Sequence, residues 1–273
     1  MWEMDDNPIL WQKSYEVTNY AEFAGCHAIQ TSTEPLADIL RQYNPHVLVF
    51  QNQLCVLPPK RQFPAKDGPV TLFFGALNRG PDWREIMPAL NEVLKEQGAR
   101  VRVRVLFDRA FFDALETEQK ELLGTEFPHG YAPYEVYTAA LHSSDIALLP
   151  LRDTAFNRAK SDLKFIESAG NGAAVLASPT VYAKTLRDGE TGFLYTDARS
   201  FRERLEILIE KPNMRRQITE AAYDYVKENR LLSQHMEERL MAWRRLITEM
   251  HSLERERTER MEVLMAAIRE GKV

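Results

Sequence analysis

The sequence predicts an α/β protein in which a doubly wound parallel sheet carries helices on both faces. Short apolar runs alternate with helical patterns along most of the 273 residues, as is typical of βαβ units. Proline and glycine punctuate this alternation, with Pro81 at the expected start of one helix and Gly98 at its expected end. The expected strands of the main sheet are 70–75, 101–107, 145–151, 173–178 and 191–195.

A smaller α/β unit is expected in residues 1–57, ahead of this sheet. Strand-like runs occur at 2–4, 28–31 and 47–50, and 34–43 reads as a helix with Thr33 as its cap. This is about half of a doubly wound domain. Residues 58–69 hold four prolines, so we expect a linker there, followed by the main domain at 70–230.

The C-terminal segment 231–273 is expected to form a long, charged amphipathic helix. Its apolar residues, which include Leu240, Trp243, Ile247 and Met250, recur at a spacing of three to four. Two interpretations stay open. The helix packs on its own chain, or it forms a coiled-coil contact with a second copy.

Composition excludes several classes of protein. The net charge of −5 argues against a nucleic-acid coat and against binding to anionic membranes. No apolar run reaches the ~20 residues of a membrane span, and the first residues lack the features of a signal peptide. Two cysteines without metal-type spacing fit a reduced, cytoplasmic protein.

Common phosphate and metal motifs are absent. Gly75 and Gly80 have the spacing of a Walker loop, but Pro81 and Asp82 follow where lysine and a hydroxyl residue belong. Gly170-Asn-Gly172 lies after a helix and before a strand, the reverse of a dinucleotide fingerprint. The six histidines show no ligand spacing. We therefore expect no metal site, and diphosphate chemistry that uses lysine, arginine and backbone amides.

The strongest candidate site follows the strand 145–151. Lys160, Lys164 and Glu167 fall at i, i+4 and i+7, which places them on one stripe of an expected helix. Two lysines in the first turns of a helix oppose its dipole, and a bound anion would resolve that conflict. The alternatives are that the lysines form a solvated face and that Glu167 is a surface carboxylate.

Other strand ends carry polar groups that could meet the same ligand. The candidates for phosphate, base or ribose contacts are Gly75, Asn78, Arg79, Gly130, Tyr131, Asn157 and Ser161. Arg79 is equally open to phosphate contact and to a surface role. Tyr131 and Tyr134 fit core or lid positions better than base stacking. Asp108, Arg109 and Arg152 fit surface or structural roles better than ligand contact.

At these residues the chain resembles the C-terminal nucleotide-sugar-binding domain of group 1 glycosyltransferases, the retaining enzymes of GT-B fold. The resemblance runs from about residue 70 to 230. It includes Phe74-Gly-Ala-Leu-Asn-Arg79, Asp145-Ile-Ala-Leu-Leu-Pro-Leu151, Lys160-Ser-Asp-Leu-Lys-Phe-Ile-Glu167 and Asp188-Gly-Glu-Thr-Gly-Phe193. Residues 1–57 resemble the last part of the partner domain, which binds the acceptor in this family.

The resemblance implies a metal-independent transfer of sugar from a nucleotide-diphosphate sugar to an acceptor hydroxyl, with retention. Glu167 matches the family's glutamate that holds the ribose hydroxyls. Arg79, Lys160 and Lys164 would neutralise the diphosphate leaving group. The implied donor-binding set is Gly75, Asn78, Arg79, Gly130, Tyr131, Asn157, Lys160, Ser161, Lys164 and Glu167. No cofactor beyond the donor is implied.

The sequence departs from the resembled family at one position, and this difference leaves a second function open. The family often has a second glutamate eight positions before Glu167, where this chain has Ala159. A non-catalytic nucleotide-binding or assembly module therefore remains an alternative to a glycosyltransferase. An NAD-dependent oxidoreductase lacks its fingerprint. The catalytic residues and the acceptor are not identified. The expected partners are a nucleotide sugar and either a second copy or a missing N-terminal half.

Overall fold

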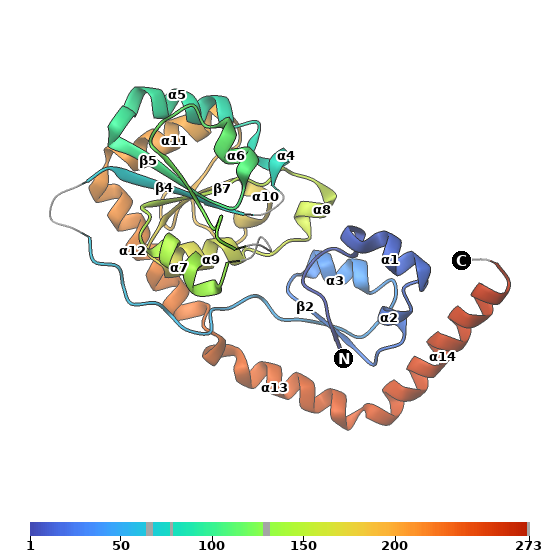
Figure 1. Cartoon of the computed structure of the whole chain (residues 1–273). Helices are drawn as coiled ribbons and strands as arrows, with labels where there is room; N and C mark the ends of the chain where they lie inside the picture. Colours follow the sequence, from blue (N-terminus) through green and yellow to red (C-terminus); the bar gives the residue numbers. More distant parts are fainter. Residues whose placement is uncertain (64–67, 77–78, 128–131, 272–273) are drawn as a thin grey trace. The chain divides into compact units, whose positions relative to one another are not determined.

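The chain is described by a computed structural model that covers residues 1–63, 68–76, 79–127 and 132–271 (Figure 1). It divides into two compact units. Unit 1 comprises Met1–Asn52, Thr154–Ser161 and Leu232–Val273, and unit 2 comprises Gln53–Asp153 and Asp162–Leu231. In these described ranges no helix is both long and apolar enough to cross a membrane.

Unit 2 contains a parallel sheet, which confirms the predicted fold class. Its strands within the described residues are β4 (Val70–Gly75), β5 (Val101–Leu106), β6 (Lys120–Leu123), β7 (Ile146–Leu149), β8 (Ala174–Ala177) and β9 (Phe193–Leu194). Their order is β6-β5-β4-β7-β8-β9, and every neighbouring pair is parallel. The chain thus builds outward in both directions from β4 and β7, which form the topological switch point of a doubly wound sheet.

Helices cover both faces of this sheet (Figure 1). Those that pack through the largest apolar cluster are α5 (Met87–Gln97), α6 (Arg109–Ala114) and α11 (Ala198–Glu210). The opposite face packs against α7 (Tyr134–His142), α9 (Leu163–Gly170) and α12 (Pro212–Asn229). Shorter elements are α4 (Gly80–Trp83), η2 (Gly98–Arg100) and α10 (Pro179–Tyr182). Because strand side chains alternate, Leu72 and Phe74 join the first cluster while Phe73 joins the second face.

Two elements of unit 2 differ from the sequence prediction. The helix expected between Pro81 and Gly98 is two helices, α4 and α5, separated by a turn at residues 84–86. Gly98 does end α5, with a φ of +53° that a glycine adopts without strain. Strand β6 was not predicted, because its sequence Lys-Glu-Leu-Leu is charged and half exposed at the edge of the sheet.

Unit 1 has a small parallel sheet of β1 (Trp2–Glu3), β2 (Ile29–Thr31) and β3 (Val47–Val49), paired in that order. Its helices are η1 (Pro8–Trp11), α1 (Gln12–Val17), α2 (Ala21–Ala24), α3 (Glu34–Leu40), α8 (Ala155–Arg158), α13 (Leu232–Thr248) and α14 (Met250–Arg269). Thr33 caps α3 as predicted, since its hydroxyl accepts a hydrogen bond from the Leu36 amide.

The C-terminal segment is two helices rather than the one long helix that was predicted, because the helix breaks at Glu249. Both helices pack on the rest of unit 1. Trp243 of α13 donates a 3.1 Å hydrogen bond from Nε1 to the Gln30 side chain. On α14, Leu253 is 1% exposed and Arg260 donates to the Cys26 carbonyl at 2.9 Å. Packing on its own chain is therefore confirmed for this segment.

Candidate functional site

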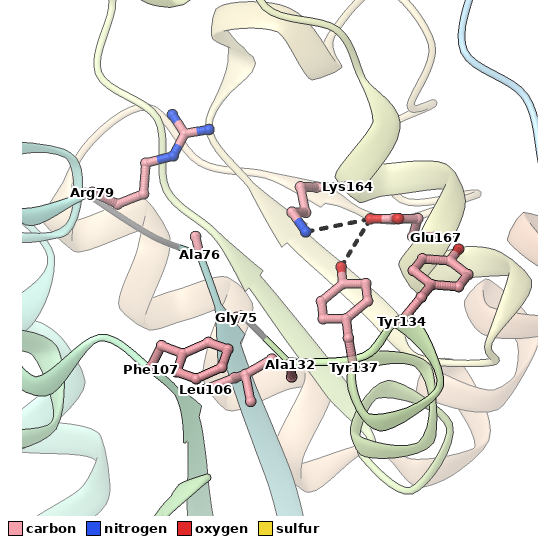
Figure 2. Close-up of a pocket in the computed structure, with 10 residues that line it drawn as sticks. All are labelled: Gly75, Ala76, Arg79, Leu106, Phe107, Ala132, Tyr134, Tyr137, Lys164 and Glu167. Atoms are coloured by element: carbon pink, nitrogen blue, oxygen red, sulfur yellow. Dashed lines mark hydrogen bonds and ion pairs between the residues drawn. The ribbon is translucent and has the colours of Figure 1, made fainter. Parts of the chain in front are cut away.

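A cavity of about 320 Å³ lies at the carboxyl ends of β4 and β5, beside the switch point of the sheet (Figure 2). Ligands of doubly wound proteins bind at this position. Its lining within the described residues is Gly75, Ala76, Arg79, Leu106, Phe107, Ala132, Tyr134, Tyr137, Lys164 and Glu167. Gly75, Arg79, Lys164 and Glu167, predicted from the sequence as ligand contacts, are therefore brought together.

A buried carboxylate, Glu167 on α9, forms the centre of the polar part of this cavity. Glu167 is 5% exposed. Its Oε2 accepts a 2.9 Å hydrogen bond from the Tyr137 hydroxyl of α7 and lies 3.4 Å from the Lys164 ammonium (Figure 2). The Lys164 ammonium also lies 4.0 Å from the centre of the Tyr137 ring. The other carboxylate oxygen, Oε1, takes no part in these contacts.

Helix α9 begins where it does because of a buried ion pair rather than a cap. Asp162, the residue before the helix, makes no side-chain capping bond. Its carboxylate instead pairs with Arg230 at 2.6 Å and accepts from the Thr185 hydroxyl at 2.6 Å. The Arg230 and Asp162 side chains are 4% and 12% exposed. This pair fixes the start of α9 and so the direction in which Lys164 and Glu167 point.

Two tyrosines keep their protons around this carboxylate. Burial, followed by the charge of Glu167, raises the pKa of Tyr134 to about 12. The same two causes raise the pKa of Tyr137 well above its usual value of 10.0. Both phenols are therefore neutral at physiological pH and can act as hydrogen-bond donors.

Two cations face the cavity. Burial lowers the pKa of Lys164 from 10.5, Glu167 opposes that shift, and the charge of Arg79 adds to it. Arg79, which immediately precedes α4, is paired with Asp82 at 3.4 Å, and the two side chains are 18% and 8% exposed. The other Asp82 oxygen accepts from the Arg152 amide at 3.1 Å. Arg79 and Lys164 repel one another, and an anion in the cavity would relieve that repulsion.

The strand ends supply the apolar wall. A Cβ at Gly75 would lie 2.4 Å from the Phe73 ring and 3.3 Å from the Tyr137 ring, so a side chain there would force the Phe73 ring to move. Phe107, after β5, adopts a φ of +66°, which is strained for a phenylalanine. Its ring occupies the space that a side chain at Gly124 would fill.

Three of the predicted donor contacts belong to unit 1 and not to this cavity. Lys160 lies before α9 and not on its stripe, which corrects the i, i+4, i+7 prediction. Its ammonium pairs with Asp6 at 2.7 Å and lies 4.6 Å from the Phe156 ring centre. The Ser161 hydroxyl accepts from the Asn52 amide at 2.8 Å, and Asn157 is 5% exposed. The predicted contacts Asn78, Gly130 and Tyr131 lie outside the described residues.

Ala159, the alanine at the position where the resembled family often has a glutamate, is a packing residue. It is 2% exposed and belongs to the apolar core of unit 1 with Met4, Phe23, Ile29, Leu36 and Leu40. Its carbonyl accepts a 2.8 Å hydrogen bond from the Thr33 hydroxyl. A glutamate here would bury its carboxylate among apolar side chains.

Tyr137 was not predicted as a residue of the site, and Tyr134 was assigned to the core or to a lid. The available signal was their spacing of three within one helix, which places both on the same side of α7. Asp108, in contrast, has the structural role that was favoured, since it caps α6 by accepting from the Phe111 amide at 2.9 Å. Across the residues that the structure covers, no group of three or more His, Cys, Asp or Glu side chains could hold a metal ion.

Solved structures with the same fold are glycosyltransferases of GT-B type. A mutant of TarM from S. aureus, solved with fondaparinux, alpha-GlcNAc-glycerol and UDP, matches with a TM-score of 0.62 and 14% identity over 83% of this chain. Sucrose-phosphate synthase from Thermosynechococcus elongatus matches with a TM-score of 0.60 and 15% identity over 86% of this chain. The pneumococcal O-GlcNAc transferase GtfA, in complex with UDP and GlcNAc, matches with a TM-score of 0.56 and 15% identity over 86% of this chain.

The chain spans 46%, 62% and 47% of the length of these three proteins. A search of curated proteins finds no match. The protein-family model described as "Glycosyl transferase-like" matches residues 100–243, more than half of the 273 residues. This match includes α7 and α9, the helices that carry Tyr137, Lys164 and Glu167. The chain therefore belongs to the glycosyl transferase-like family.

Proposed function

We propose that this chain binds a nucleotide-diphosphate sugar in the cavity of Figure 2. In this proposal the chain is a glycosyltransferase, or the donor-binding part of one, that transfers the sugar to an acceptor hydroxyl with retention and without a metal ion. The observation that carries the proposal is the buried Glu167 carboxylate, held by Tyr137 and Lys164 at the switch point of the sheet. In this proposal Glu167 accepts hydrogen bonds from the ribose hydroxyls, while Arg79 and Lys164 face the diphosphate.

The cavity has the size and charge that such a donor needs. Its volume of about 320 Å³ lies within the roughly 300–1,000 Å³ of small-molecule sites. Two cations on one side would stabilise the negative charge that develops on the diphosphate leaving group as the glycosidic bond breaks. They supply the positive charge that a divalent metal would otherwise provide.

The Glu167 carboxylate is held in a position in which it can accept hydrogen bonds from a ribose. The Tyr137 hydroxyl and the Lys164 ammonium hold the Glu167 carboxylate in its orientation before a ligand enters. Hydroxyls that donate to an ionised carboxylate make charge-assisted bonds, which are about twice as strong as neutral ones. A vicinal diol can donate twice to one carboxylate, and we therefore assign the ribose to Glu167.

A calorimetric panel tests donor binding. The full chain is titrated with UDP, GDP, ADP, TDP, CMP and NAD. UDP comes first because two of the structural neighbours were solved with it. We expect one nucleoside diphosphate to bind, and a hundredfold excess over its dissociation constant to stabilise the fold by ~2.7 kcal/mol. Absence of binding by every diphosphate at millimolar concentration would contradict the proposal.

A non-catalytic nucleotide-binding or assembly module is the second candidate, and one observation favours it. Position 159, where the family often has a glutamate, holds a core alanine in this chain. A donor-consumption assay with mixed acceptors, run on this chain alone and with an added acceptor-binding half, separates the two functions, because only a glycosyltransferase gains transfer from the added half. The isolated chain is expected to transfer little sugar, because positioning the acceptor is worth ~7–11 kcal/mol of the barrier and the first unit has only a small sheet in its described part. Turnover of roughly 1 per second or more by this chain would exclude the non-catalytic module.

A further inference from the structure

A second cavity of unit 2 lies at the amino ends of the strands, where β4, β5 and β7 begin. Its volume is about 210 Å³, and its walls include Arg61, Arg102, Arg215 and Arg216. Asp145 is the one carboxylate among the described lining residues. Four guanidinium groups around one carboxylate leave this cavity strongly positive, in a chain whose net charge is −5.

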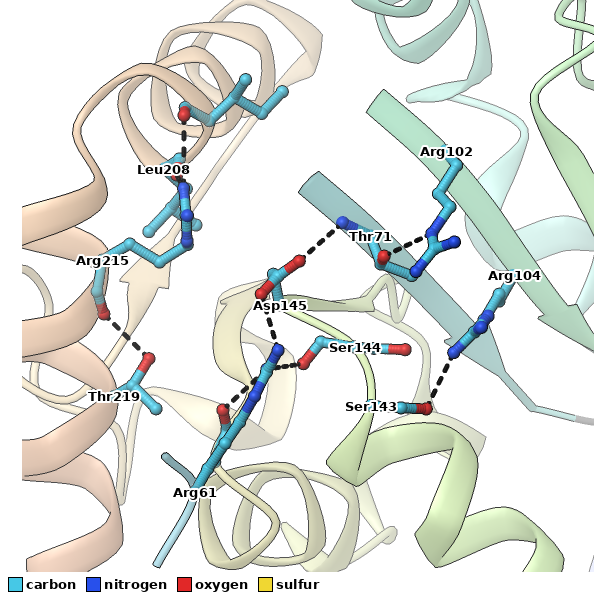
Figure 3. Close-up of polar contacts among 12 residues, drawn as sticks. Arg61, Thr71, Arg102, Arg104, Ser143, Ser144, Asp145, Leu208, Arg215 and Thr219 are labelled. Atoms are coloured by element: carbon cyan, nitrogen blue, oxygen red, sulfur yellow. Dashed lines mark hydrogen bonds and ion pairs between the residues drawn. The ribbon is translucent and has the colours of Figure 1, made fainter. Parts of the chain in front are cut away.

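The internal bonds of the cluster neutralise only part of this charge (Figure 3). The Asp145 carboxylate pairs with Arg61 at 2.8 Å and accepts from the Thr71 amide at 2.8 Å. Arg215 donates to the Leu208 and Ile209 carbonyls at 2.6 and 3.2 Å. Asp145 therefore offsets the charge of Arg61.

Two of the arginines that line the cavity have donors outside the bonds of this cluster. Arg102 is exposed and donates from Nε to the Thr71 hydroxyl at 2.7 Å, which leaves its two Nη groups outside that bond. The Arg216 Nε is buried and has no hydrogen-bond partner among the described residues, and its guanidinium lies 5.1 Å from the Phe63 ring centre. A buried donor without a partner is costly unless a ligand satisfies it.

The helix dipole adds positive potential at the same place. Helix α12 begins at Pro212, and Pro212, Arg215 and Arg216 all line the cavity. No acidic residue occupies the first turn of this 18-residue helix. Arginines near a helix N-terminus are unfavourable on their own and become favourable when an anion binds between them.

We propose that this cavity binds a phosphate dianion, free or as the monoester of a small sugar, with Arg102 and Arg216 as its principal ligands and the start of α12 behind them. Planar guanidinium groups suit bidentate contact with phosphate oxygens. The volume of about 210 Å³ is below the roughly 300 Å³ at which drug-sized sites begin. The ligand is therefore inorganic phosphate or a small phosphorylated sugar, not a dinucleotide. The site is separate from the donor cavity, which lies at the other ends of the strands.

Calorimetry with inorganic phosphate and with glucose 6-phosphate tests the proposal on the full chain. We expect binding at millimolar concentration or below, unchanged when UDP is present at saturation. Tighter binding of glucose 6-phosphate would identify a sugar phosphate as the ligand, and equal affinities would identify phosphate itself. No binding of either probe would overturn the proposal, as would loss of binding on adding UDP, because the phosphate would then occupy the donor cavity.

Variants locate the site. Arg102→Gln combined with Arg216→Gln should weaken phosphate binding by ~10-fold or more, since each removes a charge-assisted contact. Arg199→Gln is the matched control, because Arg199 is 88% exposed, pairs with Glu203 and lines neither cavity. If the double variant does not fold, Arg102→Gln alone carries the test. Equal phosphate affinity in Arg102→Gln and Arg199→Gln would place the anion elsewhere. Retention of UDP binding by the variants separates this result from a failure of the donor site.

Discussion

The Tyr137 hydroxyl donates a 2.9 Å hydrogen bond to Glu167, and the Lys164 ammonium lies over the Tyr137 ring, 4.0 Å from its centre. One tyrosine thus contacts both ends of the proposed ribose and phosphate site. The bond joins helices α7 and α9, and its two residues lie 30 positions apart in the sequence. The Glu167 side chain is 6% exposed, so Tyr137 supports a carboxylate that solvent cannot stabilise.

Tyr137→Phe should lower the free energy of unfolding by ~1.5–3 kcal/mol, the range for a hydrogen bond to a charged group. The ring and its packing against Phe73 remain, so the change reports on the hydroxyl. Urea denaturation measures the difference. Tyr195→Phe is the control, because Tyr195 is 7% exposed and has no hydrogen bond from its hydroxyl among the described residues. Equal effects of the two variants would show that the Tyr137–Glu167 bond does not stabilise the fold.

Lys164→Ala should weaken nucleoside diphosphates much more than nucleosides, because Lys164 is expected to meet phosphate and not the base or ribose. A lost charge-assisted contact corresponds to roughly tenfold in affinity or more. Calorimetry with UDP and uridine measures both. Lys95→Ala, an exposed lysine on α5, removes the same charge away from the cavity. An equal loss for UDP and uridine would remove Lys164 from the phosphate role.

UDP affinity should decline at alkaline pH, below the usual lysine pKa of 10.5. Burial lowers the pKa of Lys164 from 10.5, so the ammonium loses its proton in the window below 10.5 and its attraction for the diphosphate is lost there. The pKa of Tyr134 is about 12, so that phenol stays protonated throughout. Because the second phosphate pKa is ≈ 6, the phosphates of the ligand do not change charge in this range. Titrations from pH 8 to 10.5 on wild type and Lys164→Met check this, and a parallel decline in both would assign it to another group.

Several elements could be predicted because their signal is local. The apolar run at residues 70–75 and the Thr33 cap of α3 each depend on neighbours in the sequence, and the structure confirms both. Strand β6 could not be predicted, since Lys120 and Glu121 are unusual strand residues and become a strand by pairing with β5.

The same distinction applies to the site. Lys164 and Glu167 lie three apart on one helix, so the pattern places them together. The sequence prediction placed Lys160 on the same helix, but α9 begins only after Asp162. Asp162 pairs with Arg230, which lies 68 positions away, and the sequence pattern does not show such a tertiary contact. Tyr137 was missed for the same reason, because its bond to Glu167 is a tertiary contact.

Ala159→Glu should destabilise the protein strongly and should not create activity. The new carboxylate would replace a core methyl group that is 2% exposed, and burying an unpaired charge is among the few changes that cost more than ~3 kcal/mol. Thermal melting measures the loss. Ala155→Glu, on an exposed position of the short helix α8, which ends one residue before Ala159, is the matched control and should melt near wild type. A stable Ala159→Glu protein would show that the core around this position opens to solvent.

The central claim is that Glu167 holds the ribose of a nucleoside diphosphate. The most direct test compares UDP, or whichever diphosphate binds best in the panel, with its 2′,3′-dideoxy analogue on wild type and on Glu167→Gln. Wild type should prefer the natural nucleotide by ~10-fold or more, since hydroxyl bonds to a carboxylate are worth ~1.5–3 kcal/mol each before compensation by water. The preference should largely disappear in Glu167→Gln. A preference that is absent in wild type, or that persists unchanged in Glu167→Gln, would contradict the account.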